Sequence, residues 1–226
     1  MVSDDFRGAL FILAGMLIFS VQDVLIRQLS DGGSLLQVLT MRGVLGALVI
    51  SIFVKLTGRQ LAISSSYPFL AASRVVLFFV GFLCFYFALS HMRLAEATAL
   101  FFASPLFITA ISKLVLKETV GMFRVAAMII GFIGVMFIVQ PSADGFSVIA
   151  IFPLFTALTY SISMMIARHT KEKDTIWQQM LHLYIGSALF AGVASLVLYI
   201  LGLDEIDLPY AGYIVRQWSF ADSHVL

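Results

Sequence analysis

Two ionisable residues, Asp23 and Arg42, lie within runs of apolar residues that are long enough to cross a bilayer as helices. An ionisable side chain is costly in hydrocarbon, so each one calls for a functional or a structural role. At about 1.5 Å per residue, both side chains would lie roughly 7–10 Å below the same membrane boundary, where neighbouring helices could pair them. Such a pair would bind a carboxylate or exchange a proton, and it would equally serve as a structural ion pair.

Two further basic residues, Arg74 and His182, lie near the other membrane boundary, a few residues inside their apolar runs. Cationic groups near both boundaries would suit an anionic or amphoteric solute. Arg74 would alternatively extend its guanidinium to the membrane surface, and this snorkelling is the interpretation that the sequence favours. His182 can change its charge near neutral pH, although a histidine at a helix end is more often simply interfacial.

Pro105 stands in the middle of a predicted helix, where it would remove one backbone hydrogen bond and bend the chain. Such a break exposes a carbonyl group to a polar cavity, or it is a kink that the helix tolerates. Uncharged polar residues in otherwise apolar helices would line the same cavity, or they would hydrogen-bond one helix to another. These residues are Ser20, Gln22, Tyr86, Tyr160 and Ser161.

The elements that must position these residues are seven apolar runs. Of the 226 residues, 61% are hydrophobic and only 12% are charged. This charged fraction is about half of that in soluble domains, which predicts an all-α integral membrane protein. The predicted spans are about 8–28, 35–56, 69–91, 94–114, 121–140, 147–167 and 178–202.

Several function classes are excluded by composition and by missing motifs. A net charge of +1 offers no basic surface for nucleic acid. The single cysteine, Cys84, excludes an internal disulfide and a cysteine-based zinc site. The sequence lacks the phosphate-binding pattern G-x-x-x-x-G-K-S/T and the hydrolase patterns H-E-x-x-H and G-x-S-x-G. We therefore expect no enzyme activity, no cofactor and no metal.

The chain repeats itself with a shift of 141 residues, without a gap, over two helices and their connection. Such a repeat indicates a duplicated membrane unit, with a complete first unit of five helices at 1–140 and a partial second unit at 141–226. Ser20 and Ser161 are partners in this repeat and should face each other across its axis. Other pairs are Ala9 with Ala150, Leu13 with Leu154, Arg27 with Arg168, and Gln37 with Gln178.

The positions of Lys and Arg predict a cytoplasmic N-terminus. Equivalent helices are separated by five spans, so the second unit would be inverted relative to the first, with a site between the two near the midplane. Counterparts of 69–140 would occupy about 210–281, so we expect a truncated version of a ten-helix protein. On this orientation the cytoplasmic basic residues are Arg7, Lys55, Arg59, Lys113, Lys117, Arg124, Arg168, Lys171 and Lys173, against Arg27, Arg93 and Arg216 outside.

The chain resembles the drug/metabolite transporter superfamily, specifically its EamA-type members. The fairly specific part of the resemblance is the run RLAEATALFFASPLF at 93–107, followed by LKE at 116–118 and GFIGV at 131–135. The runs MRG at 41–43 and FYFAL at 85–89 also look like that family. The family's fold is two inverted five-helix units, and this chain departs from it in length.

The resemblance implies a secondary transporter of a small organic metabolite in the inner membrane. Such a protein works by alternating access, sometimes coupled to an ion, and riboflavin-like or S-adenosylmethionine-like solutes fit the aromatic content. Its partners would be the lipid bilayer, the solute and, in a homodimer, a second copy of the chain. The alternatives are a truncated fragment that does not transport, and a membrane enzyme with an intramembrane site at Asp23 and Arg42.

Overall fold

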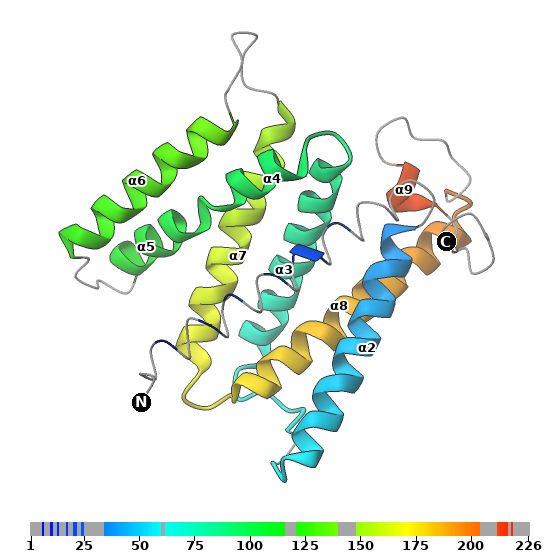
Figure 1. Cartoon of the computed structure of the whole chain (residues 1–226). Coiled ribbons are helices and arrows are strands. Elements are labelled where there is room, and N and C mark those ends of the chain that lie inside the picture. Colours follow the sequence, from blue (N-terminus) through cyan, green and yellow to red (C-terminus); the bar gives the residue numbers. More distant parts are fainter. Residues whose placement is uncertain are drawn as a thin grey trace.

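The computed structural model describes residues 34–59, 62–115, 121–139, 148–203 and 212–216, together with residues 6, 10, 13, 17, 20, 21, 24 and 218. Throughout these residues the chain forms helices and their connections, and no strand occurs in them (Figure 1). Most of the predicted span 8–28, with Gln22 and Asp23, lies outside the described residues.

The helices follow the apolar runs of the sequence closely. Five stretches are long and apolar enough to cross a membrane, and they coincide with five of the seven predicted spans. The prediction of an all-α integral membrane protein is therefore confirmed. The elements are α2 (Leu35–Leu56), α3 (Pro68–Leu89), α4 (Leu94–Phe101), α5 (Ser104–Val115), α6 (Met122–Val139), the 3-10 turn η1 (Val148–Ala150), α7 (Ile151–Thr170), α8 (Ile176–Ile200) and α9 (Gly212–Val215).

The helix ends follow local chemistry. After α2 the chain reverses at Gly58, whose φ of +67° is a conformation that side chains with a Cβ disfavour. Pro68 opens α3 at a position where its missing N–H removes no helical hydrogen bond. Thr175 caps α8, because its hydroxyl accepts a hydrogen bond from the backbone N–H of Gln178 at 3.3 Å.

The predicted span 94–114 coincides with one membrane-length stretch, and the bend that the sequence predicts at Pro105 is confirmed. The structure divides it into α4 and α5 at Phe102 and Ala103, just before Pro105 (Figure 1). Because proline has no N–H, the carbonyl group four residues earlier loses its helical donor, and the chain changes direction there. Ser161 of α7 donates a hydrogen bond to the carbonyl oxygen of Ser104 at 3.0 Å, which fixes α5 beside α7.

The bundle is organised around two helix pairs. In Figure 1, α2 lies along α8, and α3 lies between α7 and α8, which agrees with their close contacts. A buried apolar cluster joins α2, α3, α4 and α8 where α2 begins and α3 ends. Its members are Leu35, Leu36, Leu39, Phe79, Phe85, Tyr86, Leu89, Ala97 and Ala191.

The helices α2 and α8 approach each other closely at Gly43. A Cβ atom placed on Gly43 would lie 2.7 Å from the Cβ of Ala188 and 2.7 Å from the carbonyl oxygen of Tyr184. Neither neighbour can move aside as a flexible side chain would, so the two backbones approach this closely only because residue 43 has no side chain.

We expect Gly43→Ala to lower the thermal stability of the purified protein by about 1–3 kcal/mol, because the added methyl group overpacks the helix contact. Gly192→Ala is the matched control in α8, because its added Cβ would meet Thr40 only at 3.8 Å. Melting temperatures of the two variants in detergent provide the test. Equal melting temperatures would show that the contact at Gly43 is not close.

Candidate functional site

Arg42 lies against aromatic side chains near the start of α2. Its Nη1 donates a hydrogen bond to the hydroxyl oxygen of Tyr86 at 3.4 Å. The guanidinium carbon also lies 4.8 Å from the centre of the Phe82 ring, a distance at which a cation and a ring face attract each other. The predicted partner Asp23 is outside the described residues, so the predicted ion pair stays a prediction.

From Arg42, a continuous row of rings crosses the bundle. Phe82 and Phe85 both contact Tyr86, with ring centres 5.6 and 5.8 Å apart. Phe85 meets Phe101 of α4 at 5.8 Å, and Phe101 meets Tyr160 of α7 at 5.3 Å. We call these five rings the aromatic row, and it brings the predicted site residues Tyr86 and Tyr160 into one connected cluster.

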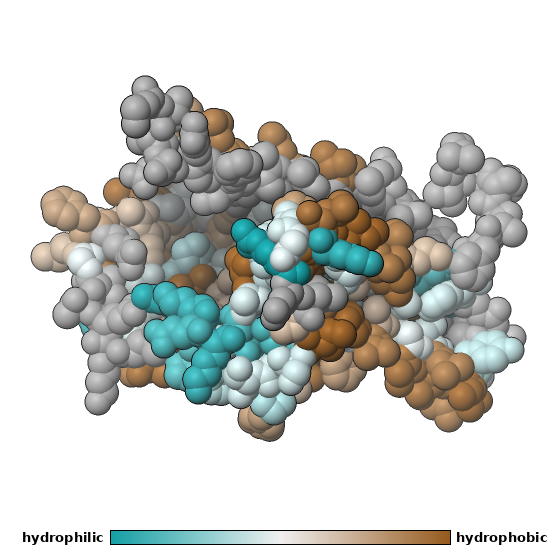
Figure 2. All heavy atoms as spheres, turned by 90° about the horizontal axis from the view of Figure 1, so that it is seen from below, coloured by the Kyte–Doolittle hydropathy of each residue, from teal (hydrophilic) through white to brown (hydrophobic). Residues whose placement is uncertain are grey.

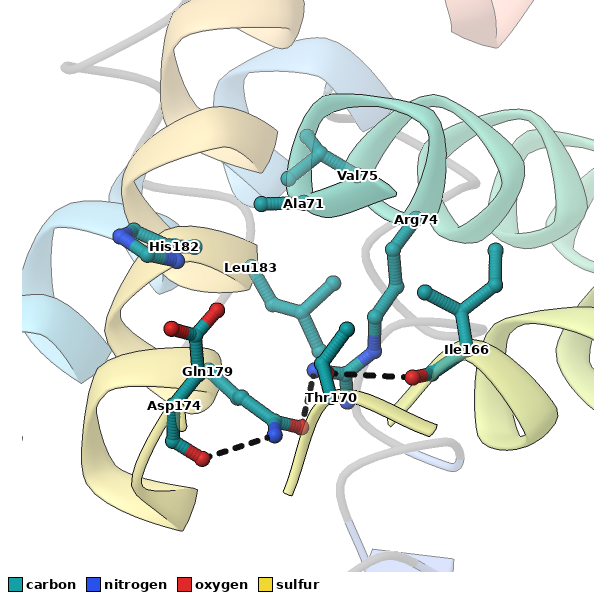
Figure 3. Close-up of a pocket in the computed structure, with 9 residues that line it drawn as sticks. All are labelled: Ala71, Arg74, Val75, Ile166, Thr170, Asp174, Gln179, His182 and Leu183. Carbon is teal, nitrogen blue, oxygen red and sulfur yellow. Dashed lines mark hydrogen bonds between the residues drawn. The ribbon is translucent and has the colours of Figure 1, made fainter. Parts of the chain in front are cut away.

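A narrow pocket lies at the other end of α3, between α3, α7 and α8 (Figure 3). Arg74 enters it from α3 with a side chain that is only 7% exposed. Its Nη1 donates a hydrogen bond to the Oε1 of Gln179 at 2.9 Å. The Nε2 of Gln179 in turn donates to the backbone oxygen of Asp174 at 3.1 Å. Thr170 and His182 complete the polar lining.

The connection between α2 and α3 is fastened beside this pocket. The carboxylate of Asp174 accepts a hydrogen bond from the hydroxyl of Ser65 at 2.5 Å and one from the backbone N–H of Ser66 at 2.9 Å. The Nε2 of Gln178 donates a hydrogen bond to the backbone oxygen of Ser64. The Nε2 of His182 lies 2.6 Å from the backbone oxygen of Ile63. We call this group of contacts the serine clasp.

Asp174 is 2% exposed and lies in the connection between α7 and α8. Burial and hydrogen bonding shift the pKa of its carboxyl group in opposite directions. Burial by itself would raise the pKa of the carboxyl group. The hydrogen bonds from Ser65 and Ser66, helped by the nearby His182, outweigh it and hold the pKa of Asp174 below its usual value. The carboxylate is therefore ionised at neutral pH and acts as the acceptor of the clasp.

The end of the bundle that carries the clasp is polar. Figure 2 looks onto it from below, the lower end in Figure 1, and shows hydrophilic side chains gathered there with hydrophobic ones at its sides. Exposed charged residues of the two connections contribute to this surface, among them Arg59, Lys171, Glu172 and Lys173. Such a surface suits the membrane–water boundary.

The sequence model of the EamA-like transporter family matches residues 6–140, more than half of the chain. The chain belongs to this family. The resemblance predicted from the sequence is thereby confirmed, and the family is one of transporters. No solved structure matches the chain.

Three curated relatives show the range of this similarity. The riboflavin transporter of Rhizobium johnstonii is 36% identical over 59% of the chain and 46% of its own length. The S-adenosylmethionine uptake transporter of Rickettsia prowazekii is 24% identical over 84% of the chain and 63% of its own length. The pseudopaline exporter of Pseudomonas aeruginosa is 26% identical over 94% of the chain and 71% of its own length. The chain thus spans about half to two thirds of the length of the first two relatives.

Three further predicted site residues of this EamA-like chain, Ser161, Ser20 and Pro105, differ in burial. The hydroxyl of Ser161 is fully buried and lies near the carbonyl oxygens of Ser104 and Ala157, so it ties α7 to α5. Ser20, its partner in the repeat, is exposed. Pro105 is also exposed, in the first turn of α5.

The favoured prediction for Arg74 was wrong. A snorkelling arginine would expose its guanidinium at the membrane surface, whereas this side chain is buried and hydrogen-bonded to Gln179. Sequence reasoning also missed Gln179 and Asp174 as site residues. The signal that could have found them is their position. Asp174 lies just before the cap of α8, and Gln179 lies in its first turn, close in sequence to the predicted residue His182.

We expect Asp174→Asn to destabilise the protein by about 1–3 kcal/mol at pH 7, because it weakens buried charge-assisted hydrogen bonds. The folded-state pKa of Asp174 is lowered, so its contribution is fully present above the ordinary carboxyl pKa of about 4 and is lost as the pH falls below it. The difference in melting temperature from the wild type should therefore shrink toward pH 3.

The matched control for this prediction is Glu172→Gln, which removes an exposed carboxylate two residues away. Its melting temperature should equal that of the wild type at both pH values. If Asp174→Asn had the same effect at pH 7 and at pH 3, the clasp would not depend on an ionised carboxylate.

Proposed function

We propose that this chain forms part of a secondary transporter that moves a small, ring-bearing organic metabolite across the inner membrane by alternating access. Membership in the EamA-like transporter family carries the proposal, because the relatives are named for riboflavin, S-adenosylmethionine and pseudopaline. The proposed pathway passes between α2, α3, α4 and α7. It contains the aromatic row and Arg42, and an ion gradient drives the movement.

The aromatic row supports a ring-bearing solute. A flat ring stacks on aromatic side chains with a gain of about 1–3 kcal/mol per contact, as bases do on nucleic-acid-binding proteins. Riboflavin is the first candidate, because a riboflavin transporter is among the relatives and because its ring system is large and flat. S-adenosylmethionine, with its smaller ring, is the second candidate.

An inverted repeat with a cytoplasmic N-terminus is the architecture that we propose for this pathway, with units at 1–140 and 141–226. Support comes from the contact between α2 and α8. Gly43 and Tyr184 are partners under the 141-residue shift, and a Cβ on Gly43 would lie 2.7 Å from the carbonyl oxygen of Tyr184. Residues beside a twofold axis touch their own partners in this way.

Uptake and efflux by the purified chain in proteoliposomes test the proposal. We expect saturable movement of radiolabelled riboflavin that exceeds that of S-adenosylmethionine and responds to an imposed proton gradient. The mass of the same preparation in detergent tests the predicted homodimer. Absence of movement of either solute by correctly folded protein would contradict the proposed function.

Phe101→Ala should weaken riboflavin binding roughly tenfold or more, because it removes the ring that links α4 to α7 in the aromatic row. Phe69→Ala is the matched control, since this ring at the start of α3 is 82% exposed. The Michaelis constant for uptake is the measurement. Equal constants for both variants would remove the aromatic row from the pathway.

A further inference from the structure

Arg74 is a buried cation whose described neighbours leave its charge uncompensated. Its Nη1 is bound to the neutral amide of Gln179, and its Nε has no hydrogen-bond partner among the described residues. Among the described residues, the ion pair within 4.0 Å is the one between Arg93 and Glu96 at the surface. No described carboxylate therefore lies within that distance of the Arg74 guanidinium. An unpaired buried charge is costly in a membrane protein, so a residue that carries one is a candidate for binding a ligand.

The nearest carboxylate in the pocket is engaged elsewhere. Figure 3 shows Gln179 between Arg74 and Asp174, with the carboxylate of Asp174 on the far side of that amide. This carboxylate is held by Ser65 and Ser66 in the serine clasp. The clasp thus holds this negative charge away from the guanidinium, whose buried Nε has no partner among the described residues.

We infer that the pocket at Arg74 binds the anionic head group, a carboxylate or a phosphate, of the transported solute. The guanidinium offers a planar set of N–H donors that matches either group. Thr170 and His182 line the same pocket, but the hydroxyl of Thr170 and the Nε2 of His182 are bonded to the backbone oxygens of Ile166 and Ile63, so the guanidinium is the donor for the anion. The pocket is too narrow for a ring system. This inference rests on the proposed function and narrows its substrate class.

The spacing along α3 sets the shape of such a solute. Arg74 and Phe82 are eight residues apart on this helix. At about 1.5 Å per residue the backbone positions of Arg74 and Phe82 are roughly 12 Å apart along the helix axis. A solute whose flat ring and anionic group are separated by about this distance would contact both sites at once. A phosphorylated or carboxylated ring compound has this form.

Riboflavin and riboflavin 5′-phosphate are a matched pair of probes, because they share a ring and differ in the phosphate. Binding is measured by flavin fluorescence on the full chain in nanodiscs of neutral phosphatidylcholine. We expect the wild type to bind the phosphate form about tenfold more tightly, as charge-assisted bonds to a buried guanidinium would give. Arg74→Gln should abolish this preference and leave riboflavin binding within about twofold, whereas the control Lys171→Gln, an exposed cation at the same end, should keep it.

Stabilisation by small anions separates this inference from the proposed function. Inorganic phosphate and acetate should raise the melting temperature of the wild type and not that of Arg74→Gln. If Arg74→Gln does not fold, Arg74→Lys decides, because it keeps the charge and should lose most of the preference. Equal stabilisation of wild type and variant overturns the head-group site, whatever the transport assays give. Stabilisation that needs Arg74, without any flavin transport, overturns the proposed function alone.

The source of the anion is tested with the lipid. Replacing phosphatidylcholine by phosphatidylglycerol supplies anionic lipid head groups to the nanodisc. Unchanged preference for riboflavin 5′-phosphate supports a solute in the pocket. Loss of that preference in anionic nanodiscs, with full stabilisation by the lipid, would identify a phospholipid as the occupant and overturn the inference.

Discussion

The close contact of α2 and α8 at Gly43 is the constraint on which the polar groups of the bundle depend. Because the two backbones meet there, α8 begins beside the connection that follows α2. Gln178 and His182 therefore reach the backbone of Ser64 and Ile63, while Asp174 reaches Ser65. The same placement sets Gln179 against Arg74. A helix contact without any polar side chain thus determines the polar pocket.

The sequence predicted the helices well where local signals were strong. The span 35–56 matches α2, because an apolar run is bounded by Ser34 and by the Thr57-Gly58 turn. The bend predicted from Pro105 lies at Phe102 and Ala103, because proline acts on the turn before it. A hydrogen bond from Ser161, 57 residues away, holds the start of α5 there. Information of this kind is absent from the run 94–114 itself.

The site was harder to predict than the fold, because its contacts join distant parts of the chain. Arg74 was assigned to the membrane surface because its partner Gln179 comes 105 residues later. Phe101 of the aromatic row was not singled out, since the chain has 21 phenylalanines and most positions of this residue simply pack. Tyr86 was singled out by its polar hydroxyl, which the structure places beside Arg42, and its role in a pathway stays a prediction.

The division of one membrane-length segment into α4 and α5 has a mechanical consequence. The two pieces have 8 and 12 residues, so at about 1.5 Å per residue each is much shorter than a hydrocarbon core of about 30 Å. A continuous helix would move as one rod, whereas two short rods have a joint in mid-membrane at Phe102 and Ala103. The half that carries Phe101 therefore takes its own direction, set by its packing against α6 and α7, while Ser161 holds the other half beside α7.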